Sequence, residues 1–137
     1  MIGTLTDTGP LVALVDKDDD YHSACLAQLP RLQRPMVTTW PCFTEAMYLF
    51  LGAEGHRGQD ELWQYVESGD VIVYEISAVE RTRMRELMAK YQDTPMDLAD
   101  ASLVAVAETL GVRRIFTVDS DFVVYRTAGK QAFEVLP

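Results

Sequence analysis

Short apolar runs alternate with longer segments of helical periodicity along this chain. The apolar runs are typical of strands, and they occupy residues 2–6, 36–39, 71–74, 115–118 and 133–136. Helices are predicted between them, over residues 9–15, 22–29, 41–52, 59–68, 77–91 and 94–110. Alternating strands and helices favour right-handed crossovers and a mostly parallel sheet covered on both faces. The chain is therefore predicted to be α/β, with three layers in the order α/β/α.

Local signals set the ends of the predicted helices. Pro10 suits a first helical position, and Gly111 suits the left-handed position that follows a last turn. Ser77 and the glutamate three residues later have the spacing of a capping box. The helix after Ser77 is predicted to have one apolar face, made of Val79, Met84, Leu87, Met88 and Tyr91. Asp97 follows Thr94 at cap spacing, so we expect it to be a structural cap of the last helix.

Four carboxylates interrupt stretches that are otherwise apolar or uncharged, namely Asp7, Glu45, Asp100 and Asp119. Glu45 is the only charge in the nineteen residues 35–53. An unpaired carboxylate in an apolar interior costs roughly several kcal/mol, so such residues need a cation, a hydrogen-bond network or a proton. Four of them in one chain predict a shared cation site.

The positions of these acids in the predicted fold favour convergence. Asp7 and Asp119 follow strands, and ligands of parallel α/β sheets bind beyond the carboxyl ends of the strands. Glu45 and Asp100 lie within the first turns of two helices that start at the same rim. Carboxylates without neighbouring histidine or cysteine form an all-oxygen site suited to Mg²⁺ or Mn²⁺. Such a cation favours phosphodiester hydrolysis, which is the reaction of a nuclease.

Composition limits the other possibilities. A length of 137 residues with 48% hydrophobic content predicts one domain over residues 1–137. No segment has the ~20 apolar residues that cross a bilayer, and the start is unlike a secretion signal, so we expect a cytoplasmic protein without a membrane segment. Cys25 and Cys42 lack metal-site spacing and are expected to be buried free thiols. The net charge of −9 argues against a broad basic surface for nucleic acid, although the candidate site contributes part of it.

Four short motifs resemble those of the PIN-domain ribonucleases, and among them those of the VapC-type toxins of bacterial toxin–antitoxin pairs. They are D-T-G-P-L at 7–11, E-A-M-Y-L at 45–49, D-L-A-D-A at 97–101 and T-V-D-S-D-F at 117–122. Each motif alone is weak, but their order and spacing match the family from about residue 2 to residue 125. The specific signal is the set of four motifs in strand and helix context.

The resemblance implies an acidic pocket of Asp7, Glu45, Asp100 and Asp119. Mg²⁺ or Mn²⁺ would be bound by Asp7 and Asp100, with Asp119 and Glu45 completing the metal shell or holding its waters. The secondary candidates are Thr8, Asp97, Thr117 and Asp121. The resemblance also implies a metal-dependent endoribonuclease that leaves a 5′-phosphate and a 3′-hydroxyl. Its expected partners are an RNA substrate, a cognate antitoxin and a second copy of the chain in a homodimer.

Three alternatives remain open. A PIN-domain nuclease that processes RNA without an antitoxin would have the same motifs. A binding protein of this fold would use the acids to hold a structural ion. The D-T-G at residues 7–9 is similar to the motif of aspartic proteases, but those are all-β, and a pair of aspartates leaves Glu45 and Asp100 unexplained.

The basic residues give a weaker prediction. Arg113, Arg114, Arg126 and Lys130 are closest in sequence to Asp119 and are the expected guides for RNA. Arg81, Arg83 and Arg85 are interleaved with glutamates and are expected on a solvated helix face.

Overall fold

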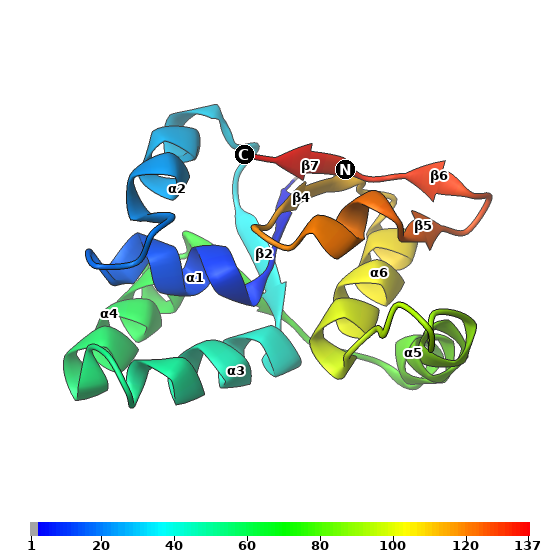
Figure 1. Cartoon of the computed structure of the whole chain (residues 1–137), viewed down its shortest axis with the longest axis horizontal. Helices are drawn as coiled ribbons and strands as arrows, with labels where there is room; N and C mark the ends of the chain where they lie inside the picture. The colour runs from blue at the N-terminus through cyan, green and yellow to red at the C-terminus, as the bar shows by residue number, and fades with distance from the viewer. Residues whose placement is uncertain (1–2) are drawn as a thin grey trace.

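A five-stranded sheet, parallel throughout, is the middle layer of the computed structural model, which describes residues 3–137 (Figure 1). Its strands, in spatial order, are β3 (Val71–Tyr74), β2 (Met36–Thr39), β1 (Thr4–Thr6), β4 (Arg114–Phe116) and β7 (Glu134–Leu136). The predicted mostly parallel α/β sheet is confirmed. Residue 2, the predicted start of the first strand, lies outside the described residues.

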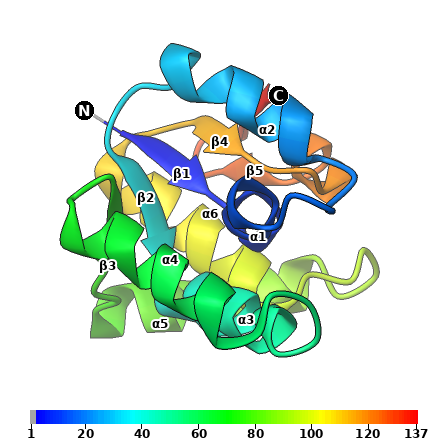
Figure 2. The ribbon, with the colours of Figure 1, turned by 90° about the vertical axis from the view of Figure 1, so that its left-hand side faces the viewer.

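Helices cover both faces of this sheet. One layer contains α1 (Thr8–Val15), α2 (His22–Gln28), the short η1 (Leu29–Arg31), α3 (Trp40–Phe50) and α4 (Gly55–Glu67). The other layer contains α5 (Ala78–Lys90) and α6 (Leu98–Leu110). Figure 2 shows α1, α3 and α4 in front of the strands, with α6 behind them. The predicted three-layer α/β/α arrangement is confirmed.

Two apolar clusters form the core, one on each face of the sheet. Met36, Val71 and Phe116 pack with α1, α3 and α4, while Leu5 and Ile115 pack with α6. This alternation follows from the two-residue period of strands, which sends neighbouring side chains to opposite faces. The sheet residues are therefore apolar on both sides, as expected for a fully covered parallel sheet.

Helix α6 is buried along most of its length. All residues from Ala99 to Ala107 are buried, which explains why this segment is small or apolar apart from Asp100. The helix begins at Leu98, one turn later than the sequence predicted, because residues 91–96 form a turn in which the amides of Thr94 and Met96 donate to the Tyr91 carbonyl. Asp97 is consequently the N-cap rather than a residue inside the first turn.

Other predicted boundaries also moved. Helix α4 begins at Gly55, four residues before the predicted start, with Gly55 at a φ of +61°. Strand β4 ends at Phe116; the Thr117 amide still donates to the Leu136 carbonyl at 2.8 Å, and Val118 then leads to Asp119. Val79 does not join the apolar face predicted for α5, because it lies in the first turn and is 77% exposed.

The segment between β4 and β7 contains structure that the sequence did not predict. It forms η2 (Ser120–Val123) and a two-residue antiparallel pair, β5 (Arg126–Thr127) with β6 (Gln131–Ala132). Tyr125 is fully buried here, and its ring packs edge-on against Phe122 and Tyr91. This aromatic cluster holds the segment against α6. No helix among residues 3–137 is long and apolar enough to span a bilayer.

We expect Gly9→Ala to destabilise the protein by ~1–3 kcal/mol, because a methyl group has no space there. A Cβ at Gly9 would lie 2.5 Å from Cγ2 of Val118, the residue before Asp119. Gly52→Ala is the matched control, since its Cβ would have no neighbour nearer than 3.8 Å. Urea unfolding of both variants measures the difference. Equal stability of the two would show that the loop after β4 yields freely.

Candidate metal centre

Asp7 lies at the junction between β1 and α1, where it caps a helix and also contributes a carboxylate to the candidate site. It is the N-cap of α1, and its Oδ1 accepts a 2.8 Å hydrogen bond from the Thr8 amide. Its own amide donates to the Phe116 carbonyl of β4 at 2.9 Å. The carboxylate is buried, so the chain carries it to the carboxyl end of the central strand and then covers it.

Thr117 connects Asp7 with Asp119. Its hydroxyl donates to Asp7 Oδ2 at 2.7 Å and accepts from the Asp119 amide at 2.9 Å. The hydroxyl has one proton, and because its oxygen already accepts from an amide, that proton points at Asp7. Thr117 therefore fixes the orientation of Asp7 and the position of the chain at Asp119. The Asp119 side chain in turn accepts from the Asp121 amide at 2.9 Å and caps η2.

Asp100 reaches the same point from the first turn of α6. The Asp97 side chain accepts from the Asp100 amide at 2.8 Å, and the Asp97 amide donates to Asp100 Oδ2 at 3.4 Å. This reciprocal pair is a capping box made of two aspartates. Tyr125 donates its hydroxyl to Asp100 Oδ2 at 3.0 Å. The cap and the tyrosine together hold a buried carboxylate in one orientation.

Three of the four predicted acids converge. Carboxylate oxygens of Asp7, Asp100 and Asp119 all lie within 4.8 Å of one another. Glu45 is not in this group: it is exposed on α3, one turn beyond Cys42. The reason is that the apolar stretch around Glu45 is not all core, since Tyr48, Leu49 and Leu51 on the same segment are exposed as well.

The protonation of the buried acids reflects their crowding. Burial raises the pKa of Asp7 from its ordinary value of 3.8 to about 6, against the hydrogen bonds from Thr117 and Thr8 that lower it. Burial, and then the charges of Asp97 and Asp7, raise the pKa of Asp100 to about 7. Burial and the charge of Asp119 also raise the pKa of Asp121. The site therefore concentrates negative charge in a buried place, and a bound cation would compensate that charge.

The secondary candidates have different surroundings. The Thr8 hydroxyl donates to the Cys42 carbonyl at 3.3 Å, so it connects α1 to α3 rather than to a carboxylate. Asp97 is exposed at the mouth of the cluster, and Asp121 is half-buried next to Asp119. Thr8, Asp97 and Asp121 reach the carboxylates of the converging acids through their backbone amides, whereas Thr117 does so with its side chain.

Two residues of the site were not predicted as part of it. Tyr125 has no motif signal, and only its burial beside α6 brings its hydroxyl to Asp100. Cys42 is a buried free thiol, as predicted, but its Sγ also lies 3.8 Å from Asp7 Oδ1. Burial and the Asp7 charge raise the pKa of this thiol to about 12, so it remains a neutral donor. Its place three residues after the end of β2 was the available sequence signal.

The donor set fits a hard divalent cation. It consists of carboxylate oxygens from three separate segments, each fixed by a helix cap, and Thr117 and Tyr125 donate to one oxygen of Asp7 and of Asp100. A site with only a few protein oxygen ligands suits Mg²⁺ or Mn²⁺, because these ions keep several coordination positions for water and substrate. The hydrogen bonds from Thr117 and Tyr125 to these carboxylates orient them before the metal binds.

The D-T-G at residues 7–9 does not have the setting of a protease pair. Asp7 caps a helix in an α/β fold and lies beside two further aspartates rather than one. The protease alternative is therefore inconsistent with the fold.

Comparison with known proteins gives the same family as the motifs. Residues 4–128 match the PIN domain family model. The chain is 25% identical over 134 residues to Ribonuclease VapC26 of Mycobacterium tuberculosis, covering 97% of this chain and 99% of that protein.

Solved structures share the fold. The crystal structure of VapC20 of Mycobacterium tuberculosis, described as a sarcin–ricin loop cleaving toxin, has a TM-score of 0.82 at 21% identity, covering 98% of this chain and 99% of that one. A toxin–antitoxin complex from Klebsiella pneumoniae has a TM-score of 0.65 at 19% identity, covering 87% and 89%. The resemblance inferred from the motifs is confirmed, and this chain belongs to the PIN domain family.

Proposed function

We propose that this protein is a Mg²⁺- or Mn²⁺-dependent endoribonuclease and the toxin of a type II toxin–antitoxin pair. The observation that carries the proposal is the convergence of Asp7, Asp100 and Asp119 within 4.8 Å, at the carboxyl end of a PIN-family sheet. The similarity to Ribonuclease VapC26 over nearly the whole chain supports the reaction class.

The proposed roles follow from the geometry of each residue. Asp7 and Asp100 are the direct ligands because both are buried and fixed, and Asp119 completes the set from the loop after β4. Thr117 and Tyr125 are positioning residues. Glu45 acts at the mouth of the site, where its exposed position on α3 suits it to hold water or substrate rather than to bind a buried ion.

The proposed reaction is hydrolysis of an RNA phosphodiester bond. When bound, the metal ion supplies electrostatic stabilisation of the phosphate and of the leaving oxygen. The carboxylates supply the negative charge that binds the ion and orient the scissile phosphate relative to it. The products are a 5′-phosphate and a 3′-hydroxyl.

The proposed substrate is a single-stranded or looped RNA, for which the sarcin–ricin loop named for VapC20 is the first candidate. The toxin–antitoxin complex among the similar structures supports a small antitoxin as partner. We further propose a homodimer that works in the cytoplasm. A short gene for a DNA-binding protein directly upstream would support the toxin over an RNA-processing role.

Cleavage of a labelled hairpin RNA is expected to require Mg²⁺ or Mn²⁺ and to stop when EDTA is added. Restoring excess metal should restore cleavage, because the carboxylates are held by the fold when the ion leaves. Gel analysis of the products, with 5′-end mapping, measures site and chemistry together. Undiminished cleavage in EDTA would exclude the metal-dependent mechanism.

A further inference from the structure

An apolar groove of about 520 Å³ lies beside the carboxylate cluster, between the start of α3, the segment after β3 and one face of α5. Its apolar lining consists of Trp40, Ile76, Met84, Met88 and Leu98, and Glu75 lines it as well, where its carboxylate accepts a 3.3 Å hydrogen bond from the Trp40 indole nitrogen. Arg81 and Arg85 stand at its edge. Trp40 is 40% exposed and Leu98 is 52% exposed, so the groove offers a flat aromatic ring and an aliphatic side chain to a ligand.

The groove and the candidate metal centre draw residues from the same two helix starts. Leu98 is the first residue of α6 and stands between Asp97 and Asp100 in sequence. Trp40 is the first residue of α3, and Cys42, two residues later, contacts both Asp7 and the Ala99 carbonyl. Residues of the groove and of the cluster therefore alternate along the first turns of α3 and α6.

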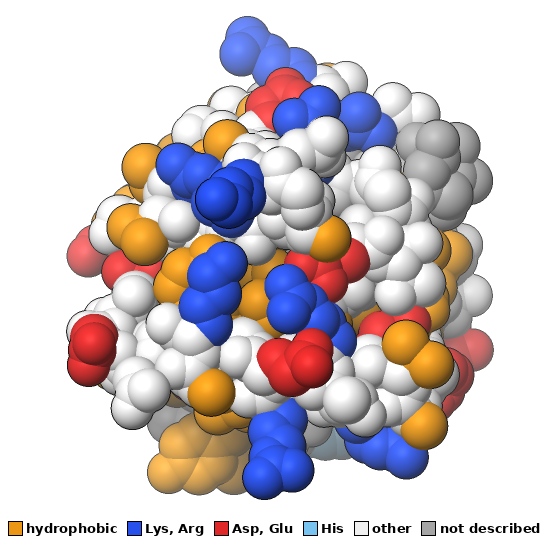
Figure 3. All heavy atoms as spheres, turned by 90° about the vertical axis from the view of Figure 1, so that its right-hand side faces the viewer, with side chains coloured by type: hydrophobic (Ala, Val, Ile, Leu, Met, Phe, Trp, Pro, Cys, Tyr) orange, Lys and Arg blue, Asp and Glu red, His pale blue; other side chains and the backbone are white. Residues whose placement is uncertain are grey.

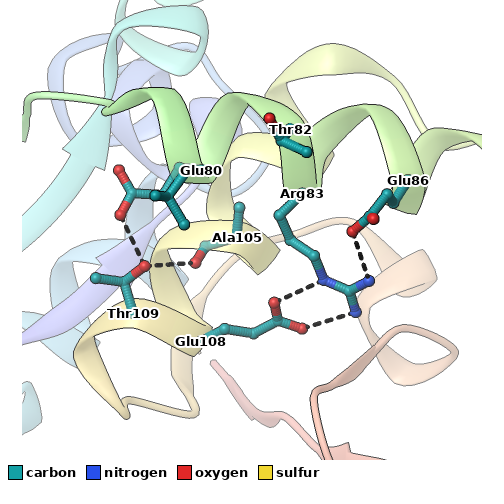
Figure 4. Close-up of a pocket in the computed structure, with 8 residues that line it drawn as sticks. Glu80, Thr82, Arg83, Glu86, Ala105, Glu108 and Thr109 are labelled. Atoms are coloured by element: carbon teal, nitrogen blue, oxygen red, sulfur yellow. Dashed lines mark hydrogen bonds and ion pairs between the residues drawn. The ribbon is translucent and has the colours of Figure 1, made fainter.

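The two arginines at the edge differ from the other arginine of α5. Arg83 binds Glu108 through two hydrogen bonds of 2.8 and 3.0 Å and also contacts Glu86 at 3.5 Å (Figure 4). Arg81 and Arg85 are exposed, lie one turn apart, and form no ion pair within residues 3–137. Arg83 therefore fastens α5 to α6, while its neighbours have guanidinium groups available to a ligand.

Two of the arginines expected to guide RNA are occupied by the fold itself. Arg114 donates to the Gly3 carbonyl at 3.2 Å. Arg126 donates to three carbonyls at the end of η2, at 2.7 to 3.1 Å. Both side chains are engaged by backbone carbonyls. Arg113 and Lys130 are exposed and remain as the alternative basic pair for binding RNA.

The charges of the chain are divided between its two halves. Residues 1–77 contain 12 acidic and four basic residues, whereas residues 78–137 contain nine acidic and eight basic residues. Four of those nine acids belong to the candidate metal centre or adjoin it, namely Asp97, Asp100, Asp119 and Asp121. Figure 3 shows Lys and Arg side chains spread over the face that carries α5 and the β5–β6 pair, with apolar side chains between them.

We propose that this groove binds the RNA nucleotide next to the scissile phosphate. The base packs on Trp40 and Leu98, and Arg81 and Arg85 bind the phosphate that follows it. Aromatic side chains stack on any base, and arginine pairs with phosphate in a bidentate manner, so this combination matches single-stranded RNA. Two exposed guanidinium groups outside any ion pair within residues 3–137, next to apolar side chains, favour a polyanion with exposed bases over a second copy of the chain. The proposal rests on the proposed ribonuclease function.

The two tryptophans of the chain give a direct test, because Trp40 and Trp63 have similar exposures of 40% and 43% and lie on different helices. In an uncleaving Asp7→Asn background, Trp63→Phe leaves only Trp40 as fluorophore, and Trp40→Phe leaves only Trp63. A single-stranded RNA oligonucleotide of mixed sequence is titrated with Mg²⁺ present, and its own binding is followed by the anisotropy of an end label. We expect saturable quenching of Trp40 and none of Trp63. Bound RNA without quenching of Trp40 would overturn the proposal.

Charge removal provides a second test in the cleaving protein. The double variant Arg81→Gln, Arg85→Gln should raise KM about 10-fold, leave kcat within about 2-fold, and reduce the salt dependence of binding. The variant Lys17→Gln, Arg31→Gln removes the same charge elsewhere and should leave KM unchanged. If KM rises only in the double variant Arg113→Gln, Lys130→Gln, RNA binds near the β5–β6 pair, and the proposal that it binds in the groove is overturned.

Two further outcomes separate the groove from the function. Light scattering that shows a dimer dissociating in the Arg81, Arg85 variant would make the groove a subunit interface and overturn the RNA proposal. If the unmodified protein cuts no RNA, the proposed function fails, and Trp40 quenching still reports whether the groove binds RNA. Metal-dependent cleavage without Trp40 quenching would support the proposed ribonuclease function and overturn the proposal that the groove binds RNA.

Discussion

Asp100→Asn should reduce RNA cleavage on the order of 10³-fold and, without a metal, should raise the melting temperature at neutral pH. Loss of one direct ligand removes an ionic interaction worth several kcal/mol in the transition state, roughly. The gain in stability has a different cause. Burial of the Asp100 carboxylate, and then the charges of Asp97, Asp7 and Asp119 beside it, raise its pKa to about 7.

Asparagine retains the contacts that place the side chain. An amide oxygen at the position of Oδ2 still accepts from the Tyr125 hydroxyl and from the Asp97 amide. The repulsion disappears, so the metal-free variant should melt several degrees higher, at about 4 °C per kcal/mol for a chain of this size. Added Mn²⁺ should stabilise the unmodified protein more than the variant.

Asp93→Asn is the matched control for both measurements. Asp93 is exposed and outside the cluster, so its variant should keep the cleavage rate and the melting temperature. Cleavage assays and differential scanning calorimetry with and without Mn²⁺ give the comparison. An Asp100→Asn protein that cuts RNA at the normal rate would remove Asp100 from the metal centre.

Without a metal, the protein should lose stability as the pH rises from about 5 to about 8. Asp7 and Asp100 have pKa values of about 6 and about 7 in the folded protein and an ordinary value of 3.8. The folded state therefore binds more protons than the unfolded state in this interval. Stability from these two groups is fully present below about pH 4 and is lost as the pH passes through 6 and 7.

Glu80 has the opposite sign and acts in a different interval. Hydrogen bonds from Ser77, Thr109 and Tyr74 outweigh its burial and lower its pKa below the ordinary value of 4.5. Its stabilisation is present above that value and is lost only in more acidic solution. The change between about pH 5 and about pH 8 therefore reports on the metal centre.

Calorimetry over this pH range is the measurement, with saturating Mg²⁺ in a parallel series. We expect a fall in melting temperature on the order of 5–10 °C without the ion and a much smaller one with it, because the cation keeps both carboxylates ionised. The Asp100→Asn variant should show a reduced fall. A metal-free profile that rises with pH would contradict the crowding of these acids.

The sequence predicted the architecture well because its signals are local and repeated. Every strand of the main sheet lies within or overlaps a predicted strand, and the apolar composition of residues 101–107 matches a helix buried all round. The errors are at boundaries, where tertiary hydrogen bonds decide. Thr94 had the right spacing to start α6, but the amides of Thr94 and Met96 close the turn after α5, and Asp97 became the cap.

The candidate site was predicted in part, and Glu45 shows why. An isolated charge in an apolar stretch was interpreted as buried, which holds for Asp7 and Asp100. In α3 the apolar residues extend round the helix, so Tyr48 and Leu51 are 70% and 66% exposed, and Glu45 is exposed with them. Composition does not reveal which face of such a helix meets the core.

Tyr125 could not be predicted from any local pattern. Its hydroxyl reaches Asp100 only because Phe122 and Tyr91 pack against its ring and η2 turns the chain back over α6. A contact of this kind depends on three segments that are distant in sequence, and no short motif records it.

The uneven division of charge between the two halves has a consequence for encounters in solution. The net charge of −9 repels a polyanion, but the repulsion is uneven, because residues 1–77 carry nearly all of that charge and residues 78–137 are close to neutral, so a distant polyanion turns the molecule before contact. The end with α5 and the β5–β6 pair then faces the polyanion, and the end with α1–α4 faces away. Collisions become productive more often than random tumbling allows, and this advantage fades once added salt shortens the screening length to about 3 Å at 1 M.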